Sequence, residues 1–509
     1  MSAVLPAKIQ QLKKQALRQR HLPGPWFELA TVCGAQGLIE EAAEAYEQLG
    51  KLQPQNWQVW FFLANQQYAL GRYPQALDHY LKAMQLNQGS WEVRNNLAVL
   101  LKLLGERQLA EKCLLEALDL KPDYLEAIAN LGNLYRDQQQ FDKAHLCFDT
   151  ALEIKPDSAE LLTNLGLLHK EQGQLDEAIA VYRRAVAQPS YPPELPYNYA
   201  IALIQSGDFR QGFAWYEKRW LIPRLNARRQ LFDAVLREWQ GEFLGGKTLL
   251  VWNEQGLGDM IQMARYLPLW KAHYHDCRII LCVDPSLVRL FAGLPGADSV
   301  VGMNQALPQA DYHLSAMSFP FRLHTEIETI PHPEPYLRAN DALRAVWAER
   351  LGPKGDRPRV GIVWQSGQSG VGQQALDRQS RSLAPDVLAQ LLRLCPVEWI
   401  NLQVGEDEIP AEVSGLMRHL PQAIGDFADS AAILSSLDAL VSVDTAASHL
   451  GAALGIPTWV LMRATGGNLF PAEGECMPWY RAMTVLRQRT LYDWQPVIAE
   501  VAERLHGLA

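Results

Sequence analysis

The sequence predicts an α-helical repeat array followed by an α/β region made of two wound domains. A 34-residue period runs through the first two fifths of the 509-residue chain. After residue 247, short apolar runs of strand type alternate with helical patterns, and the first of these runs leads directly into a loop with two glycines. A chain of this length is too long for one hydrophobic core, so several domains are expected.

Composition and charge exclude several classes of protein. The formal net charge is −9, and no cluster of Lys and Arg dominates, which argues against a general nucleic-acid binder. Residues 1–21 are polar without the apolar core of a signal peptide, and no apolar run approaches the length of a membrane span. The seven cysteines are scattered without CxxC spacing, so neither a disulfide framework nor a zinc site is favoured. A reduced, cytoplasmic protein is therefore expected.

The repeats combine a small residue, a large residue four positions later and a turn residue between helices. The small residues are Ala42, Ala76, Ala110, Ala144, Ala178 and Gly212; the large ones are Tyr46, Tyr80, Leu114, Phe148, Tyr182 and Tyr216; the turn residues are Gly37, Gly71, Gly105, Gln139, Gly173 and Gly207. Small residues let paired helices approach closely, so a stack of helix hairpins is predicted. The pattern resembles the tetratricopeptide repeat (TPR), with five full units and a sixth over residues 23–220, preceded by an N-terminal helix in residues 1–22.

Four asparagines recur at nearly the repeat spacing, on the predicted first helices of the hairpins. They are Asn65, Asn96, Asn130 and Asn164. A ladder of amides along one groove can hydrogen-bond an extended peptide backbone. The same amides can instead tie neighbouring helices together, and the sequence leaves both interpretations open. A protein partner or acceptor, captured by the array, is the leading expectation.

The period is lost in residues 221–246, which we predict to be a linker. A first series of strands follows in an N-terminal Rossmann-like domain, residues 247–345, at 248–252, 278–283, 299–301 and 312–314. A second series lies in a C-terminal domain, residues 358–509, at 359–364, 397–402, 439–443 and 458–462, with helices expected at 387–394 and 430–437. In such wound domains ligands bind at the carboxyl edge of the sheet.

The loop after the first strand carries the candidate catalytic residue, Asp259. A dinucleotide-binding loop would need a third glycine where Ile261 stands, and the Asp259 carboxylate would repel a pyrophosphate. An aspartate at a helix N-terminus that faces a cleft can instead accept the proton of an attacking acceptor group. The alternative is a simple capping aspartate. The neighbouring residues Glu254, Gln255, Gly256 and Gly258 form the predicted acceptor-side loop.

Three further stretches predict the donor-binding side. Asp444, Thr445 and Ala446 begin a helix with short side chains, where backbone N–H groups are open to a phosphate, and His449 follows on the same face. For His449 alone, a satisfied half-buried histidine is the alternative. The remaining candidates are Ser366, Gly367 and Arg381 in the loop after the strand at 359–364, and Gln403 after the strand at 397–402. Arg381 would neutralise a leaving diphosphate and Gln403 would meet a base or ribose.

Together these motifs resemble heptosyltransferase-like glycosyltransferases of the family nine type, which have the GT-B fold. The matching segments are EQGLGD at 254–259, RYLP at 265–268, PYL at 335–337, VGIVW at 360–364, RS at 381–382, LQ at 402–403, DFADSAA at 426–432, VDTAASHLGAALGIP at 443–457, PWY at 478–480 and RQ at 487–488.

The resemblance implies metal-independent transfer of a sugar from a nucleotide-sugar co-substrate, with no further cofactor. By this resemblance Asp259 matches the catalytic base, Thr445, Ala446 and His449 match the diphosphate-binding turn, and Arg381 matches a basic residue for the phosphates. The segment 463–470 departs from the DWRW motif of many relatives, and the loop before Arg381 lacks a histidine common there. The alternative is therefore a non-catalytic TPR scaffold with a degenerate, nucleotide-binding domain.

Overall fold

The computed structural model describes residues 6–331, 335–367, 380–405, 409–420, 424–464, 467, 469–471 and 474–508. Between Leu168 and His169 the chain divides into two compact units. The first is entirely helical, and the second contains the end of the repeats and two β-sheets. Among the described residues, no helix combines the length and the apolar character that crossing a membrane requires.

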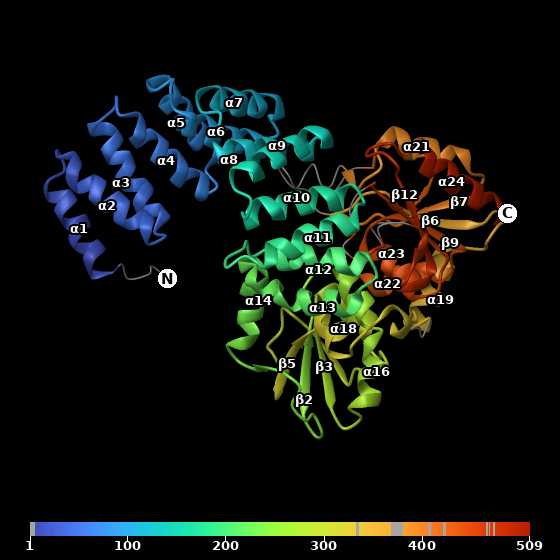
Figure 1. Cartoon of the computed structure of the whole chain (residues 1–509). Helices are drawn as coiled ribbons and strands as arrows, with labels where there is room; N and C mark the ends of the chain where they lie inside the picture. Colours follow the sequence, from blue (N-terminus) through green and yellow to red (C-terminus); the bar gives the residue numbers. More distant parts are fainter. Residues whose placement is uncertain are drawn as a thin grey trace. The chain divides into compact units, whose positions relative to one another are not determined.

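The first unit is a solenoid of helix hairpins (Figure 1). Its helices are α1 (Ala7–Arg18), α2 (Pro23–Ala35), α3 (Ile39–Leu52), α4 (Trp57–Ala69), α5 (Tyr73–Leu86), α6 (Trp91–Leu103), α7 (Arg107–Leu120), α8 (Leu125–Asp137) and α9 (Phe141–Ile154), followed by α10 (Ala159–Glu171), which crosses the division between the units. Contacts are densest within the pairs α2–α3, α4–α5, α6–α7 and α8–α9. The predicted TPR architecture is confirmed for this region.

The repeat residues occupy the positions that the 34-residue period predicts. Ala42, Ala76, Ala110 and Ala144 have no exposed surface, which lets the paired helices approach closely. The turn glycines adopt left-handed backbone, as Gly105 does with φ +87°. Gln139 holds the equivalent position at φ 59°, where a residue with a Cβ is strained.

The second unit begins with the last helices of the array. These are α11 (Leu175–Val186), α12 (Leu195–Gln205) and α13 (Phe209–Tyr216), followed by the 3₁₀ turn η1 (Glu217–Leu221) and α14 (Pro223–Asp233). The segment 221–246, predicted as a linker, contains α14 and a short strand, β1 (Arg237–Glu238), which pairs in parallel with β5 (Tyr312–Ser315). This segment is therefore an integral part of the first sheet, because its backbone completes the sheet's edge.

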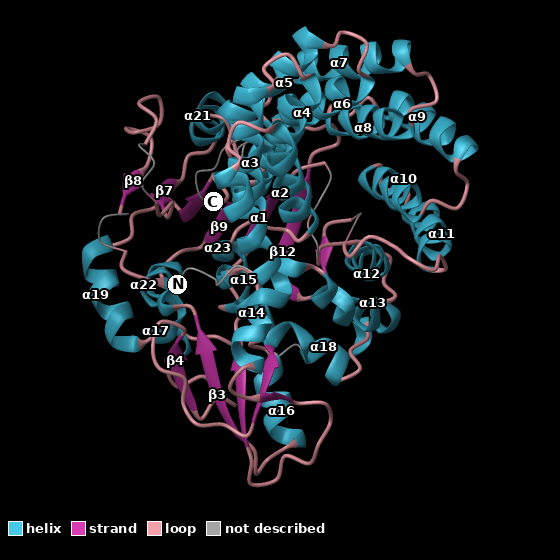
Figure 2. Ribbon diagram, turned by 90° about the vertical axis from the view of Figure 1, so that its left-hand side faces the viewer, coloured by secondary structure: helices cyan, strands magenta, loops and turns pink. Residues whose placement is uncertain are grey.

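The first sheet has the order β1-β5-β2-β3-β4, and all its pairings are parallel. Its other strands are β2 (Thr248–Trp252), β3 (Arg278–Val283) and β4 (Ser299–Gly302), and Figure 2 shows β3 beside β4. The helical segments of this region are α15 (Leu257–Met263), α16 (Tyr266–His273), η2 (Pro285–Leu287), α17 (Val288–Phe291), η3 (Ala316–Ser318), α18 (Phe319–Arg322), η4 (Ile327–Thr329) and α19 (Asp341–Leu351).

The second sheet has the order β11-β12-β10-β9-β6-β7-β8, in which only the pairing of β11 with β12 is antiparallel. Its strands are β6 (Arg359–Val363), β7 (Glu398–Asn401), β8 (Arg418–His419), β9 (Ala439–Val443), β10 (Thr458–Met462), β11 (Cys476–Met477) and β12 (Tyr480–Arg487). The helices are α21 (Pro385–Leu394), α22 (Phe427–Leu434), α23 (Ala446–Ala453) and α24 (Gln495–His506). The predicted helix at 430–437 begins and ends earlier than expected, and β12 and α24 were not predicted.

One hydrophobic core joins the last repeat hairpin to both sheets. It contains Ile204 and Phe213 of that hairpin together with Val251, Leu440 and Trp479. Phe209 stacks on the Trp479 ring with centroids 5.4 Å apart. Close packing also explains the glycine at 212, since a Cβ there would lie 2.6 Å from the Ile204 side chain. The hairpin α12–α13 therefore packs as part of the α/β body.

Candidate functional site

Asp259 lies in the first turn of α15, directly after the loop that leaves β2. Its Oδ2 accepts a hydrogen bond of 2.9 Å from the backbone N–H of Gly256, so it does act as a cap. The side chain is half-buried, and burial raises the pKa of Asp259 to about 7. The carboxylates of Asp444 and Glu254 add to this increase, whereas the Gly256 N–H and the Arg381 guanidinium oppose it. A carboxylate whose pKa lies near neutrality is suited to general base chemistry.

The N-terminal end of α15 packs closely against α23. A Cβ placed on Gly258 would lie 2.6 Å from Cδ2 of His449, so only glycine allows this approach. His449 is 7% exposed, and its Nδ1 lies 3.1 Å from the Tyr480 hydroxyl. The first sheet's Asp259 loop and the second sheet's His449 helix therefore meet directly.

His449 is a neutral imidazole in this environment. Burial lowers its pKa to about 4; Arg265 lowers it further, and Asp444 partly opposes the change. When the Tyr480 hydroxyl donates to Nδ1, the remaining proton is on Nε2, and a neutral ring can still donate from that atom. The burial and the satisfied Nδ1 agree with the alternative interpretation of a satisfied histidine, and contact with a diphosphate stays a prediction.

The turn before α23 presents uncapped backbone N–H groups. Thr445 is the N-cap residue, but its side chain makes no capping hydrogen bond. Its Oγ1 lies 3.0 Å from Ser442 Oγ instead. The first amides of α23, at Ala446 and beyond, are thus placed as an anion site requires.

Arg381 and Arg487 lie near Asp444, which follows β9, and Arg463, which follows β10, lies beside them. Arg381 donates from Nη2 to the Asp444 backbone oxygen at 2.9 Å and to its Oδ2 at 3.1 Å. Arg487 donates to the backbone oxygens of Arg463 and Pro471, and Arg463 donates to Ser380 Oγ. Burial lowers the pKa of Arg487, and the Asp444 carboxylate opposes this shift. This concentration of positive charge suits an anionic ligand.

Arg463 and Arg487 were not among the predicted site residues. A usable signal was present for Arg463, which directly follows a predicted strand, where side chains reach the sheet's carboxyl edge. Arg487 ends β12, a strand that was not predicted, but it belongs to the matching segment RQ at 487–488, which was the available signal.

The remaining donor-side candidates lie at the carboxyl ends of β6 and β7. Gln403 Oε1 accepts from the backbone N–H groups of Trp364 and Gln365, at 3.2 and 3.0 Å, and contact of this residue with a base or ribose stays a prediction. The Ser366 N–H donates to Ser382 Oγ at 3.2 Å, and Gly367 adopts φ +76° with open space where a Cβ would stand. Residues 368–379, the part of this loop before Arg381 in which a histidine is common among relatives, lie outside the described residues.

The predicted acceptor-side loop is more enclosed than expected. Glu254 is 5% exposed and forms an ion pair with Arg219, and its place beside an acceptor stays a prediction. Gln255 is half-buried and donates from Nε2 to the Tyr216 hydroxyl. Of the four predicted loop residues, Gly256 alone is exposed. The side chains of this loop therefore face the last repeat hairpin.

The four asparagines of the predicted peptide groove are half-buried. Asn96 donates to Asn65 Oδ1 at 3.0 Å, and Asn130 donates to Asn95 Oδ1 at 2.8 Å. The contacts that tie neighbouring helices are thus present for three of the four. Asn164 is equally half-buried, and peptide binding by this ladder stays a prediction.

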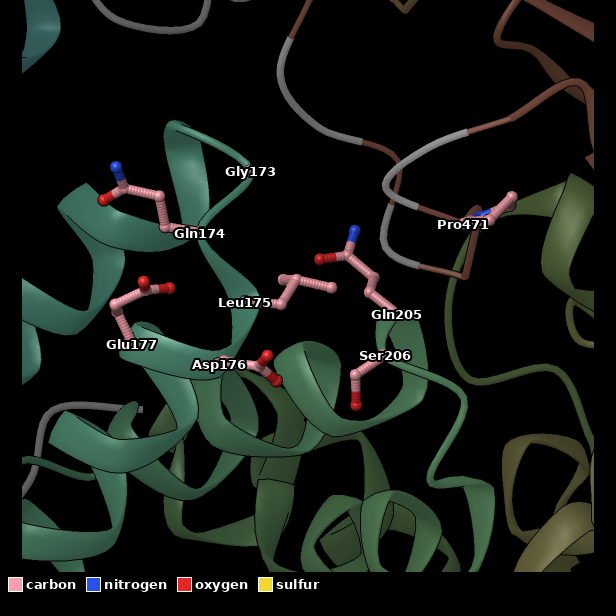
Figure 3. Close-up of a pocket in the computed structure, with 8 residues that line it drawn as sticks. All are labelled: Gly173, Gln174, Leu175, Asp176, Glu177, Gln205, Ser206 and Pro471. Atoms are coloured by element: carbon pink, nitrogen blue, oxygen red, sulfur yellow. The ribbon is translucent and has the colours of Figure 1, made fainter.

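A pocket of about 410 Å³ lies away from these residues, beside the last two repeat turns (Figure 3). It is lined by Gly173, Gln174, Leu175, Asp176, Glu177, Gln205, Ser206 and Pro471. None of the predicted site residues lines it, so its volume does not bear on the chemistry of Asp259.

Comparisons with known proteins identify the repeats. Residues 27–90 and 129–193 match the tetratricopeptide repeat, and residues 92–124 match a second form of the same repeat. The Caulobacter vibrioides protein FlbA is 28% identical over 335 residues, which are 61% of this chain and 54% of FlbA. The match thus spans about half the length of that curated relative.

Two solved structures also resemble part of the chain. TTC0263, a thermophilic TPR protein of Thermus thermophilus, is 25% identical with a TM-score of 0.33 and covers 36% of this chain and 100% of its own. YrrB, described as a TPR protein with an unusual peptide-binding site, is 19% identical with a TM-score of 0.29 and covers 34% of this chain and 90% of its own.

Proposed function

We propose that the protein, in which tetratricopeptide repeats are joined to a region with two largely parallel sheets, is a metal-independent glycosyltransferase with a GT-B arrangement. It would transfer a sugar from a nucleotide-sugar to a protein acceptor captured by the repeats in the cytoplasm. The observation that carries this proposal is the direct packing of the Asp259 helix on the His449 helix, with Arg381 and Asp444 within electrostatic range of Asp259. A base and an anion-ready turn are then side by side, as transfer between an acceptor and a nucleotide diphosphate requires.

In the proposed mechanism, Asp259 removes the proton of the acceptor group as that group attacks the sugar. Its pKa of about 7 means that a substantial fraction of the carboxyl is ionised at neutral pH. The α23 amides and the three arginines stabilise the negative charge that develops on the departing diphosphate. His449, as a neutral ring, contributes a hydrogen bond rather than a charge.

Replacement of the proposed base gives the first test. Asp259→Asn should abolish transfer, because an amide cannot accept the proton, while binding of the nucleotide-sugar, measured by calorimetry, is retained. In the unmodified protein, the rate should fall below a pH of about 7 as Asp259 becomes protonated. Transfer by the Asn variant at an unchanged rate would refute the assignment.

The alternative is a TPR scaffold whose α/β region has lost activity. The family matches to the repeats favour protein binding, which both functions share. Calorimetry with a panel of nucleotide-sugars and free nucleotides separates a transferase from a purely structural scaffold, which should bind none of them. A protein that binds nucleotides without transferring sugar would point to a nucleotide-sensing module.

A further inference from the structure

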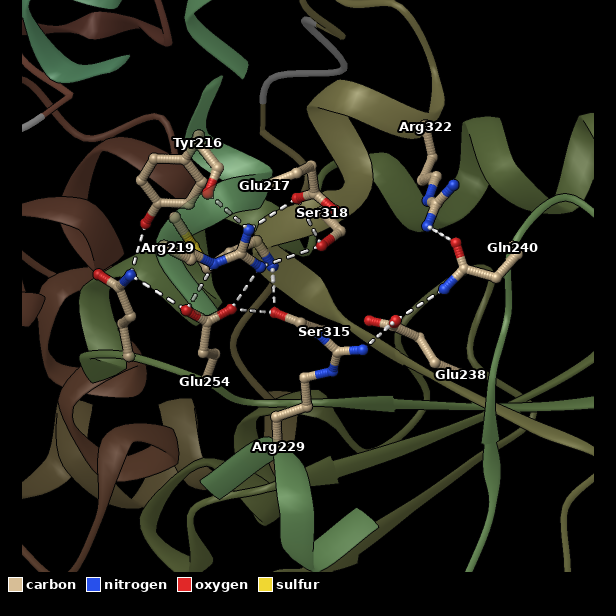
Figure 4. Close-up of polar contacts among 12 residues, drawn as sticks. Tyr216, Glu217, Arg219, Arg229, Glu238, Gln240, Glu254, Ser315, Ser318 and Arg322 are labelled. Atoms are coloured by element: carbon tan, nitrogen blue, oxygen red, sulfur yellow. Dashed lines mark hydrogen bonds and ion pairs between the residues drawn. The ribbon is translucent and has the colours of Figure 1, made fainter. Parts of the chain in front are cut away.

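The last repeat hairpin is connected to the Asp259 loop by a buried polar network (Figure 4). Arg219, in η1 directly after the hairpin, has no exposed surface. Its Nε and Nη2 donate to the two carboxylate oxygens of Glu254 at 2.8 and 2.7 Å. Glu254 lies on the loop between β2 and α15, two residues before the helix cap Gly256. Arg219, at the end of the repeat array, thus binds the loop through two hydrogen bonds to one carboxylate.

All five N–H donors of the Arg219 guanidinium have acceptors. Besides the two bonds to Glu254, Nη2 donates to Ser318 Oγ at 3.0 Å, and Nη1 donates to Glu217 Oε1 at 2.7 Å and to the Tyr216 backbone oxygen at 3.2 Å. The acceptors come from the end of α13, from η1, from the loop and from η3. Because the guanidinium is planar and its donors are fixed in direction, this set of bonds specifies where the loop lies.

Further contacts reinforce the connection. The Tyr216 hydroxyl accepts from Gln255 Nε2, the next residue of the loop. Glu254 also accepts from Ser315 Oγ at the end of β5. On its outer side the loop is bound by Arg228 of α14, which donates to the Glu254 backbone oxygen at 2.8 Å. Apart from Ser315, which ends β5, the side chains that hold the loop lie outside the sheet it leaves.

We propose that Arg219 is a positioning residue for Asp259, so that the end of the repeat array is a working part of the transfer site as well as a region that binds a partner. The proposal rests on the proposed function for the identity of that site. Arg219 does not act on substrate; it fixes Glu254, and through the short segment to Gly256 it fixes the start of α15. Displacement of a reacting group by about 1 Å can cost on the order of 10²-fold in rate.

The test uses Arg219→Lys in the full chain. Lysine keeps the charge, but its three donors cannot replace five in this geometry. The matched control is Arg359→Lys, because Arg359 is likewise buried and ion-paired, to Glu398 at 2.7 Å on the second sheet, and has no place in the site. Hydrogen exchange is followed at the amides of Asn253, Gly256 and Met260, which are all hydrogen-bonded around the loop.

We expect exchange at these three amides to be at least about tenfold faster in Arg219→Lys and unchanged in Arg359→Lys, since lost hydrogen bonds to a charged group are worth that factor. The kcat should fall by about 10–100-fold with donor affinity unchanged. Tyr216→Phe removes only the hydroxyl that accepts from Gln255, and it is the variant to measure if Arg219→Lys does not fold. It should also accelerate exchange at the loop.

The two proposals fail in different ways. The positioning role is overturned if hydrogen exchange at the loop is unchanged in both Arg219→Lys and Tyr216→Phe, or if exchange is accelerated without a fall in kcat. Either result leaves transfer by the unmodified protein intact. If the unmodified protein transfers no sugar, the proposed function is wrong, and with it the positioning role in transfer.

Discussion

Substitution Gly258→Ala tests how closely α15 and α23 approach. In a helix, Gly→Ala is ordinarily stabilising by about 0.5–1 kcal/mol. Here the new Cβ would lie 2.6 Å from His449 Cδ2, whereas ordinary contacts begin at 3.4 Å, so a movement of about 0.8 Å is needed. The ring cannot swing freely, because it is packed beside the rings of Phe470 and Tyr480, with centroids at 5.9 and 5.6 Å.

The contact between the new Cβ and His449 therefore decides whether Gly258→Ala stabilises or destabilises the protein. Overpacking of this kind costs about 1–3 kcal/mol, which exceeds the gain from helix propensity. The assay is thermal unfolding followed by circular dichroism, in which the midpoint of the large second unit should fall by about 1–2 °C for each kcal/mol. Gly355→Ala is the control, since no atom lies within 4 Å of its added Cβ. A midpoint for Gly258→Ala equal to or above that of the parent would refute the tight packing of the two helices.

Two further predictions concern stability. The pKa of Asp259 is raised in the folded state, so the stability that this carboxyl contributes is present below its unfolded pKa near 4 and is lost as pH rises towards 7. Relative to the parent, Asp259→Asn should therefore gain stability over that pH range. The prediction is contradicted if the free energies of unfolding of the two proteins change with pH in parallel. Gln139→Gly should stabilise the first unit by about 0.5–1 kcal/mol in urea denaturation, because it relieves a φ of 59°, whereas the reverse change, Gly105→Ala, should destabilise it. Equal midpoints for the two variants would exclude strain at Gln139.

The enclosure of the Asp259 loop also bears on how acceptors reach the site. Tyr197 and Tyr216, from α12 and α13, have ring centroids 5.6 Å apart. Burial raises the pKa values of both hydroxyls, and the Asp259 and Glu254 carboxylates add to this increase. Aromatic side chains of the repeat array thus lie within electrostatic range of Asp259. In the proposed transferase, an acceptor that approaches Asp259 would do so beside the final repeat.

The sequence by itself determined the features that depend on local pattern. The 34-residue period predicted the TPR hairpins, because the interior of each hairpin repeats the same packing of Ala and aromatic residues. The strands β2, β3, β9 and β10 were predicted with their observed bounds, because buried parallel strands are short apolar runs. The position of Asp259 at the start of a helix was also predicted, because it follows from the order of strand, loop and helix.

Tertiary structure alone decided which groups from distant segments meet. Arg219 and Glu254 are both charged residues that a sequence pattern would assign to the surface, yet they pair with no exposure for the arginine. The linker expected at 221–246 became part of the first sheet, since edge pairing by β1 depends on β5, which lies far along the chain. The proximity of Gly258 and His449 likewise follows from two sheets sharing one core, and no local periodicity encodes such a contact.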